Sequence, residues 1–274
     1  TINDICMVGG KPVALSLAMV IEEGFETEDL ERIMRSIEET SKQTGIPVIT
    51  GDLKVVERNS LKEIIINTSG IGKRHELLDK NFEIVRKHRK IKYEWLVDSN
   101  LADGDVIIVS GYIGDHGIAV LSQREGYGFE TKVKSDVQPL NKMVEKLLEV
   151  GGVVALKDPT RGGLAEALNE WSLKSNIGIY IEEEKIPIRE EVKSACELLG
   201  IDPLEIGNEG KAIIAVTENK AEEVLEALRE TKEGKDAEII GRVDKNYEYV
   251  VMKTEVGGLR VVERPIGDPI PRIC

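Results

Sequence analysis

The chain has 274 residues, of which 41% are hydrophobic and 32% charged, and its formal net charge at pH 7 is −13. This length suffices for two ordinary domains or one large one, and the composition is typical of a globular protein with a hydrophobic core. The negative charge argues against nucleic-acid binding, because no basic stripe is available to neutralise phosphates.

Two further classes of protein are disfavoured by the sequence. No apolar run approaches the roughly 20 residues that span a bilayer, and no signal peptide is present, so we expect no membrane association. Cys6, Cys196 and Cys274 are far apart in sequence and form neither a disulfide framework nor a CxxC metal pair. We therefore expect a cytoplasmic protein, in which Cys6 and Cys196, set among apolar residues, serve packing.

The first part of the chain predicts a strand, a helix and two more strands. The apolar run 12–22 predicts a buried strand, and apolar residues at helical spacing predict a helix that begins near Thr27 and stops at Gly45. The segment IPVITGDLKVV predicts a strand that enters a turn at Gly51 and Asp52, and KEIIINTSGIG predicts another strand. This order is typical of an α+β fold.

The polar stretch DSNLADG predicts a boundary, after which a second α/β unit begins with DVIIVSGYIGDHG. Later segments alternate between helical and strand patterns and close with three strands, EIIGRV, YVVMKT and LRVVER. The predicted organisation is a domain at 1–98, a second domain at 99–264 and a mobile tail at 265–274. Prolines in the tail exclude regular helix, so we expect it to be extended, with a reach of roughly 30 Å.

Four polar stretches combine Asp with Gly at predicted strand or helix ends: NDICMVGGKP, TGDLKVVE, IGDHG and DPTRGGL. Gly allows the backbone to approach a phosphate, Asp is a hard oxygen ligand for Mg²⁺, and cations such as Lys54 and Arg161 can neutralise phosphoryl charge. Each stretch alone is more typical of a tight turn with an Asp cap. DPTRGGL carries more weight because it opens a predicted helix, where Arg161 and Gly162 would meet an anion.

Two other features invite a chemical interpretation. Glu209 lies between glycines in GNEGK, where it is either a general base or a solvated turn residue. The chain ends in PIPRIC, which places Cys274 on a proline-rich tail with a free thiol, in the wrong position for prenylation.

PIPRIC at the terminus, with GDHG, DPTRGG and NEGK in that order, resembles the HypE family of hydrogenase maturation factors, the carbamoyl dehydratases. The resemblance covers essentially the whole chain. The Asp/Gly stretches alone indicate the wider superfamily of aminoimidazole ribonucleotide synthetase, selenophosphate synthetase and thiamine-phosphate kinase. The resemblance implies two α/β domains of the aminoimidazole ribonucleotide synthetase type, with ATP bound between them and a homodimer formed through the N-terminal β-sheet.

The resemblance also implies a reaction. A carbamoyltransferase, HypF, would load Cys274, and ATP with Mg²⁺ would then drive dehydration of the S-carbamoyl group to a thiocyanate. The cyano group would pass to iron on a HypC–HypD scaffold as a ligand of a [NiFe] hydrogenase. Residue by residue, the resemblance implies Asp4 and Asp158 as Mg²⁺ ligands and Cys274 as carrier. The remaining implied positions are Asn3, Gly51, Asp52, Lys54, Arg161 and Gly162 near the nucleotide, and Glu209 as the candidate proton acceptor.

One departure concerns the front of the chain, which begins TINDIC without a methionine. The family carries a further glycine-rich segment and another Asp before the ND motif, so we expect the front to be missing and ATP binding by these 274 residues to be weakened. Two alternatives stay open: another ATP-using member of the superfamily that acts on a small substrate, and an interaction protein whose tail docks on a partner and whose nucleotide site is inactive.

Overall fold

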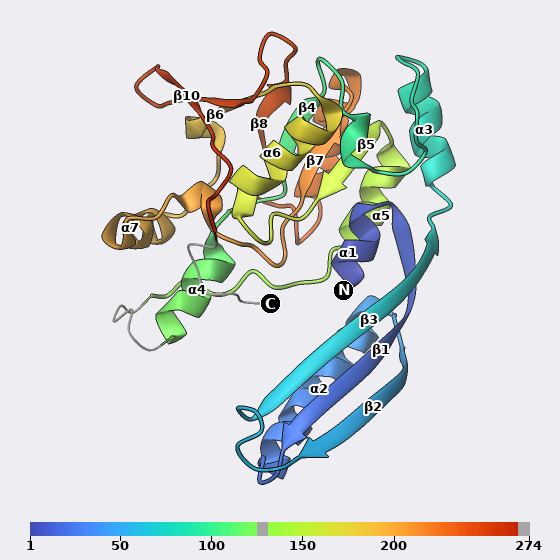
Figure 1. Ribbon diagram of the computed structural model, residues 1–274. Coiled ribbons are helices and arrows are strands. Elements are labelled where there is room, and N and C mark those ends of the chain that lie inside the picture. The colour runs from blue at the N-terminus through green and yellow to red at the C-terminus, as the bar shows by residue number, and fades with distance from the viewer. Residues whose placement is uncertain (125–130, 268–274) are drawn as a thin grey trace.

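The computed structural model describes residues 1–124 and 131–267 (Figure 1). Within these residues the chain forms a three-stranded sheet with strand order β2-β1-β3 and a seven-stranded sheet with strand order β10-β9-β6-β8-β4-β7-β5. The two sheets lie at opposite ends of the molecule, and helices pack on both (Figure 1). The predicted α+β class is confirmed.

The smaller sheet is built around β1. β2 pairs with it in parallel and β3 in antiparallel orientation. The elements of this part are α1 (Ile2–Met7), β1 (Gly10–Glu22), α2 (Thr27–Thr44), β2 (Val48–Val56) and β3 (Ile64–Arg74).

Only five of the 13 residues of β1 are buried, so the prediction of a buried strand was correct for one face of the strand only. Leu17 and Met19 are buried, whereas Ala18 between them is exposed. α2 lies behind the sheet in Figure 1 and covers the face to which Leu17 and Met19 point. Glu26, rather than Thr27, is the N-cap of α2, and Gly45 ends the helix in the left-handed conformation, as predicted.

The predicted turn at Gly51 and Asp52 was also wrong, because β2 runs through both residues without interruption. Gly51 pairs with Leu17 of β1, and a Cβ at Gly51 would lie 2.5 Å from the Leu17 carbonyl oxygen. The glycine is therefore required by the close approach of two paired strands. Pairing with a neighbouring strand here overrides the local preference of a Gly-Asp pair for a turn.

The larger sheet is mostly antiparallel, with β6 and β9 as its parallel pair. Its strands are β4 (Val106–Val109), β5 (Val153–Lys157), β6 (Ile179–Glu182), β7 (Ile213–Val216), β8 (Glu238–Val243), β9 (Val250–Lys253) and β10 (Leu259–Val261). The accompanying helices are α3 (Leu78–Arg86), α4 (Asp115–Gln123), α5 (Asn141–Val150), α6 (Gly163–Ser175), α7 (Glu190–Leu199) and α8 (Ala221–Arg229). Short 3₁₀ turns occur at Asp98–Asn100, Glu183–Lys185, Pro203–Glu205 and Glu218–Lys220.

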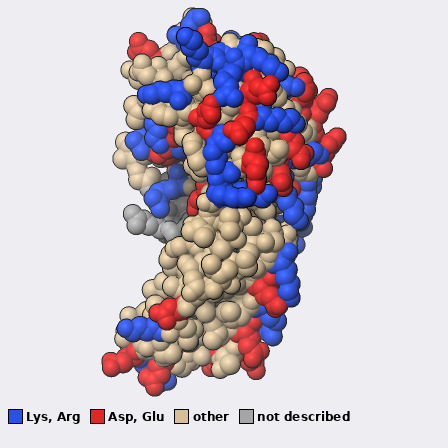
Figure 2. Space-filling model, turned by 90° about the vertical axis from the view of Figure 1, so that its right-hand side faces the viewer, with Lys and Arg blue, Asp and Glu red and all other residues tan. Residues whose placement is uncertain are grey.

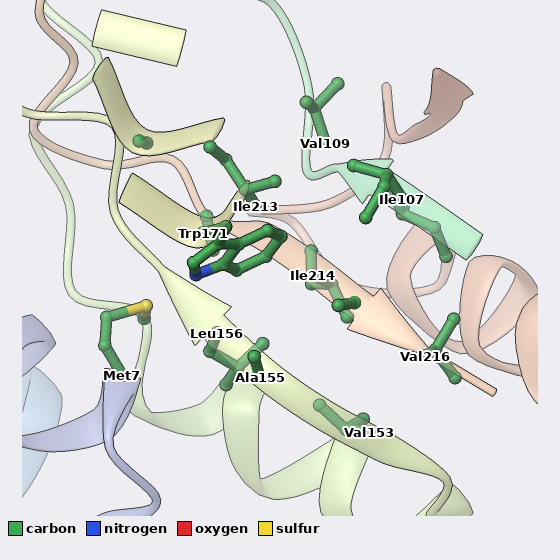
Figure 3. Close-up of a cluster of buried hydrophobic side chains, with 14 of the residues drawn as sticks. Met7, Ile107, Val109, Val153, Ala155, Leu156, Trp171, Ile213, Ile214 and Val216 are labelled. Carbon is green, nitrogen blue, oxygen red and sulfur yellow. The ribbon is translucent and has the colours of Figure 1, made fainter. Parts of the chain in front are cut away.

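The main hydrophobic core crosses the predicted boundary at residue 98. Met7 of α1 and Phe82 of α3 belong to the same buried cluster as Leu156, Trp171 and Ile214 of the second part. Figure 3 shows the Trp171 ring of α6 beside strands β5 and β7, with Met7 at the edge of the cluster. The continuous core fixes α1, which carries the ND motif, against the second part of the chain.

The outer face of the smaller sheet is open. Ile65 and Ile71 of β3 are more than half exposed, and Figure 2 shows a broad surface with few charged side chains over the lower part of the molecule, where the smaller sheet lies. Among the described helices, none has the length and apolar character that a membrane crossing requires.

Candidate functional site

Asp4, Asp158 and Glu209 come together between the two parts of the chain. Asp4 is on α1, Asp158 follows β5, and Glu209 lies in the turn before β7. Burial raises the pKa of the Asp158 carboxyl, and the negative charges of Asp4 and Glu209 raise it further. The three predicted acids therefore form one cluster of like charge.

Two adjoining cavities meet at this cluster. The smaller, of about 1050 Å³, and the larger, of about 1380 Å³, share the walls formed by Asp4, Asp158 and the loop from Thr160 to Gly162. Glu209 lines the larger cavity. The beginning of the C-terminal segment, including Pro265 and Gly267, lines the smaller one.

The DPTRGG loop forms the N-terminal end of α6, as predicted. Gly162 is the N-cap of the helix, with φ of 72°, and Gly163 follows with φ of 60°. A Cβ on Gly163 would lie 2.5 Å from the Leu204 carbonyl oxygen, so the loop packs directly on a neighbouring backbone. Arg161 and Gly162 line both cavities, which places them beside the N-terminus of a 13-residue helix, where an anion is favoured.

Asn208 joins three of the sequence motifs. Its side chain is fully buried, and its Oδ1 accepts a hydrogen bond of 2.8 Å from the backbone N–H of Gly114 in GDHG. Its Nδ2 donates to the carbonyl oxygens of Pro159 in DPTRGG, at 3.2 Å, and of Ile206, at 3.0 Å. Asn208 itself belongs to NEGK, so one amide side chain fixes the relative positions of the three loops. The sequence alone did not single it out.

Asn3 has a similar function on the other side of Glu209. Its Nδ2 donates to the carbonyl oxygens of Gln138 and Glu209, and its Oδ1 accepts from the backbone N–H of Leu140. Asn3 was expected to bind the nucleotide. That role stays a prediction, and the contacts of its side chain hold the Glu209 turn against the 131–140 segment.

Asp136 and Gln138 are further residues that the sequence did not suggest. Asp136 Oδ1 accepts a hydrogen bond of 2.9 Å from the Glu209 backbone N–H, and Gln138 Nε2 donates to the Gly210 carbonyl oxygen at 3.0 Å. They lie in a polar stretch, KSDVQPL, which has no recognisable motif. Their part in the site is visible only in the folded structure, where both side chains contact the NEGK turn.

Gly51, Asp52 and Lys54 do not join this cluster within one chain. All three are exposed on β2, an edge strand of the smaller sheet, and none is among the described residues that line either cavity. Asp52 and Lys54 point to the open face of the sheet, since they pair with Ala18 and Val20 of β1. A contribution from them to the Asp4 and Asp158 cluster would require a second copy of the chain.

The predicted carrier Cys274 lies outside the described residues. Of the other cysteines, Cys6 and Cys196 are 2% exposed, and burial raises the pKa of their thiols to about 12 and about 11. These two thiols are therefore unsuited to act as nucleophiles. Just before the tail, Arg264 pairs with Glu166 of α6, and Arg264 Nε donates to both carboxylate oxygens, at 2.8 and 2.9 Å.

The acid cluster fits Mg²⁺ held jointly with a nucleotide. Among the described residues, no group of three or more His, Cys, Asp or Glu side chains is arranged to hold a metal ion alone. Mg²⁺ in nucleotide sites typically uses one or two carboxylates, with phosphate and water oxygens as the other ligands. Asp4 and Asp158 provide such a pair, and a cation would relieve the repulsion that adds to the effect of burial in raising the Asp158 pKa.

Comparison with known proteins agrees with these observations. The family model described as the N-terminal domain of AIR synthase related proteins matches residues 1–73, and the model of the C-terminal domain matches residues 102–253. A putative hydrogenase expression/formation protein of Methanocaldococcus jannaschii is 53% identical over all of this chain and 76% of its own length. The carbamoyl dehydratase HypE of Escherichia coli is 37% identical, with 100% of this chain and 76% of that protein covered.

Solved structures give the same result. A HypE structure in complex with ATP has a TM-score of 0.88 and 39% identity, and covers 100% of this chain and 79% of that one. The HypE chain of a HypE–HypF complex has a TM-score of 0.86 and 45% identity, with 97% and 82% covered. Thiamine monophosphate kinase of Aquifex aeolicus, at 19% identity and a TM-score of 0.63, shares the fold. Two domain models and relatives 37% to 53% identical over its whole length show that the chain belongs to the HypE family of AIR synthase-related proteins.

Proposed function

We propose that this protein is an ATP-dependent carbamoyl dehydratase that converts an S-carbamoyl group on Cys274 into a thiocyanate, the source of cyanide ligands for [NiFe] hydrogenase. The observation that carries the proposal is the meeting of Asp4, Asp158 and Glu209 at two cavities, one of which is bounded by the base of the tail. Seven residues follow Gly267. At most about 3.6 Å per residue, they give Cys274 a reach of about 25 Å from this wall.

The overall reaction converts the S-carbamoyl group and ATP into thiocyanate, ADP and phosphate. The carbamoyl oxygen attacks the γ-phosphorus of ATP, the bond to ADP breaks, and the oxygen then leaves carbon as phosphate. The nitrogen loses both of its protons as the C≡N bond forms. The protein must therefore orient the oxygen, neutralise phosphoryl charge and accept protons from nitrogen.

Asp4 and Asp158 would hold Mg²⁺, which when bound neutralises the charge of the ATP phosphates. The N-terminus of α6, with Arg161 and Gly162, would bind phosphoryl oxygens through backbone N–H groups and a cation. Glu209 is the candidate proton acceptor, because it lines the larger cavity and its backbone is fixed by Asn3 and Asp136. The alternative role of Glu209 is that of a turn carboxylate.

We further propose that the protein acts as a homodimer through the open face of the smaller sheet. Such pairing would cover Ile65 and Ile71, which are more than half exposed in one chain. It would also allow Asp52 and Lys54 of one copy to contribute to the phosphate site of the other. A relative forms a complex with HypF, and we propose the same carbamoyltransferase and a HypC–HypD scaffold as partners of this protein.

Mass spectrometry of the C-terminal peptide tests the function. The full-length protein, incubated with a carbamoyltransferase, carbamoyl phosphate and ATP, should first gain a carbamoyl group on Cys274 and then lose the mass of one water. Cys274→Ala should show neither change, whereas the matched control Cys196→Ala should show both. ATP consumption that is unaffected by Cys274→Ala would refute the proposal and favour a small-molecule substrate. Absence of ATP consumption in every variant would favour an interaction protein.

A further inference from the structure

Three buried polar side chains in the wall of the larger cavity have one unpartnered atom each. Asp115, His116 and Asp136 are 5%, 9% and 9% exposed, and all three line this cavity. Among the described residues, Asp115 Oδ1, His116 Nε2 and Asp136 Oδ2 have no hydrogen-bond partner. Buried polar atoms are almost always paired in folded proteins, so three exceptions in one wall indicate a place built for a polar guest.

The other polar atom of each side chain is engaged, and these contacts fix the orientation of the unpartnered atoms. Asp115 Oδ2 accepts from Arg189 Nε at 3.0 Å, and the Arg189 guanidinium lies 4.0 Å from the centre of the Tyr112 ring. Asp136 Oδ1 accepts from the Glu209 backbone N–H at 2.9 Å. The His116 Nδ1 lies 2.8 Å from the Ser135 hydroxyl oxygen.

The contact with Ser135 is compatible with a tautomer of His116 that carries its ring proton on Nε2. The Ser135 oxygen already accepts from the Val137 backbone N–H at 3.2 Å. Its hydroxyl hydrogen can donate to His116 Nδ1, and in that tautomer of His116 the ring proton is on Nε2. The wall then presents two acceptors, on Asp115 and Asp136, and one donor, on His116.

The charges around the wall favour a neutral guest. Burial raises the pKa of both the Asp115 and the Asp136 carboxyls, while Lys211 opposes that rise at each. Arg189 lowers the Asp115 pKa, and Glu191 raises it. Two carboxyls whose charge is balanced by nearby cations offer no net attraction either to a free phosphate or to a cation. As stated above, no metal-holding group of acids and histidines exists among the described residues.

We propose that Asp115, His116 and Asp136 form a carboxamide-binding site that holds the carbamoyl group during dehydration. A primary carboxamide has two N–H donors and one carbonyl oxygen, which complement the two carboxyl acceptors and the His116 donor. The inference rests on the proposed function, because that function supplies the carboxamide. Asp136 contacts the backbone of Glu209, so an amide nitrogen bound at Asp136 lies beside the turn that carries the candidate proton acceptor.

This arrangement also favours the chemistry. Hydrogen bonds from the amide nitrogen to carboxylates increase the electron density on the carbonyl oxygen through amide resonance, and that oxygen must attack phosphorus. The carbonyl oxygen has two lone pairs, so donation from His116 leaves the second available for the attack. The three residues act as positioning groups before bond cleavage and as a selectivity filter for a primary amide.

The test uses full-length Cys274→Ala protein and a small probe, S-carbamoyl-N-acetylcysteine, with binding followed by the NMR signals of the His116 ring. We expect saturable shifts with this probe and none with its N,N-dimethyl analogue, which lacks both N–H donors. Asp136→Asn replaces the acceptor with a donor and should weaken binding about tenfold to a hundredfold. Glu233→Gln, at a residue that also lines the cavity, is the matched control and should leave binding unchanged.

His116→Gln provides an independent check should Asp136→Asn disturb the fold. It should weaken binding of the primary carbamoyl probe, measured by calorimetry because this variant has no His116 ring signals, without changing ATP affinity. Equal binding of the two probes, or unchanged affinity in both folded variants, would overturn the inference. Failure of the proposed function is distinguishable, because a wild-type protein that binds the carbamoyl probe but never forms thiocyanate refutes only the dehydration.

Discussion

Replacement of Asn208 by Ala should destabilise the protein and separate the loops of the candidate site. The side chain is fully buried, and its Oδ1 is the partner of the Gly114 N–H at 2.8 Å. The Pro159 carbonyl oxygen keeps a second hydrogen bond, because it also accepts from the Asn208 backbone N–H at 2.9 Å. Truncation therefore leaves two groups without the partner they had, the Gly114 N–H and the Ile206 carbonyl.

Each buried group deprived of its partner costs about 1–3 kcal/mol, and partial relaxation of the loops gives an expected loss of about 2–4 kcal/mol. A chain of this size loses about 2–4 °C in Tm per kcal/mol, so Tm should fall by about 4–16 °C. Urea denaturation followed by circular dichroism measures the free energy of unfolding, with Asn246→Ala, at an exposed position, as the control. A decrease in the free energy of unfolding below about 0.5 kcal/mol, or one equal to that of the control, would refute the interpretation that Asn208 holds the three loops together.

Asn208→Asp tests the same hydrogen bonds through the pH dependence of stability, which Asn208→Ala cannot do. The carboxylate would still accept from Gly114 but would face the Pro159 and Ile206 carbonyl oxygens, so its pKa in the folded state should lie above that of the unfolded chain. A carboxyl with a raised folded pKa favours folding at low pH and loses that contribution as pH rises through the folded value. The variant should therefore recover stability, relative to wild type, as pH is lowered from 7 toward 5. A pH-independent difference would contradict this reasoning.

Three other predictions concern the acids and the sheet. Glu209→Gln should bind ATP and accept carbamoyl normally but form thiocyanate about 10²–10⁴-fold more slowly in single-turnover mass spectrometry, and a near-normal rate would exclude Glu209 as the base. Because burial and like charge raise the Asp158 pKa, Asp158→Asn should increase Tm at pH 7 while activity is lost. The increase in Tm should shrink as pH falls, since the wild-type carboxyl then becomes protonated, and a lower Tm at pH 7 would contradict this. If Lys54 acts across a dimer, a mixture of inactive Lys54→Ala and Asp158→Asn proteins should regain up to roughly a quarter of wild-type activity, and no recovery would count against it.

The sequence predicted the local features of the site better than its contacts. DPTRGG was expected to open a helix and does so, because glycine at a helix N-terminus is a local backbone property. Asp136 was missed, since its contact with the Glu209 N–H joins residues 73 positions apart and depends on the folded loop. The turn at Gly51 failed for the opposite reason, because the ladder with β1 imposed a strand on a dipeptide that favours turns.

The clustered acids and the unpartnered atoms reduce the stability of the protein without ligand, and a bound ligand would remove this disadvantage. Asp158 is partly buried beside Asp4 and Glu209, and in the adjoining wall polar atoms of Asp115, His116 and Asp136 have no partner within residues 1–124 and 131–267. Such a site persists only where its surroundings determine it, and here the surroundings are the Asn3 and Asn208 hydrogen bonds and a continuous core beneath them. Bound ligands can then relieve the repulsion and satisfy the orphaned atoms without any rearrangement of the loops. Positioning alone can accelerate phosphoryl transfer when the groups that bind the charge or the amide are already fixed in place before the ligand arrives.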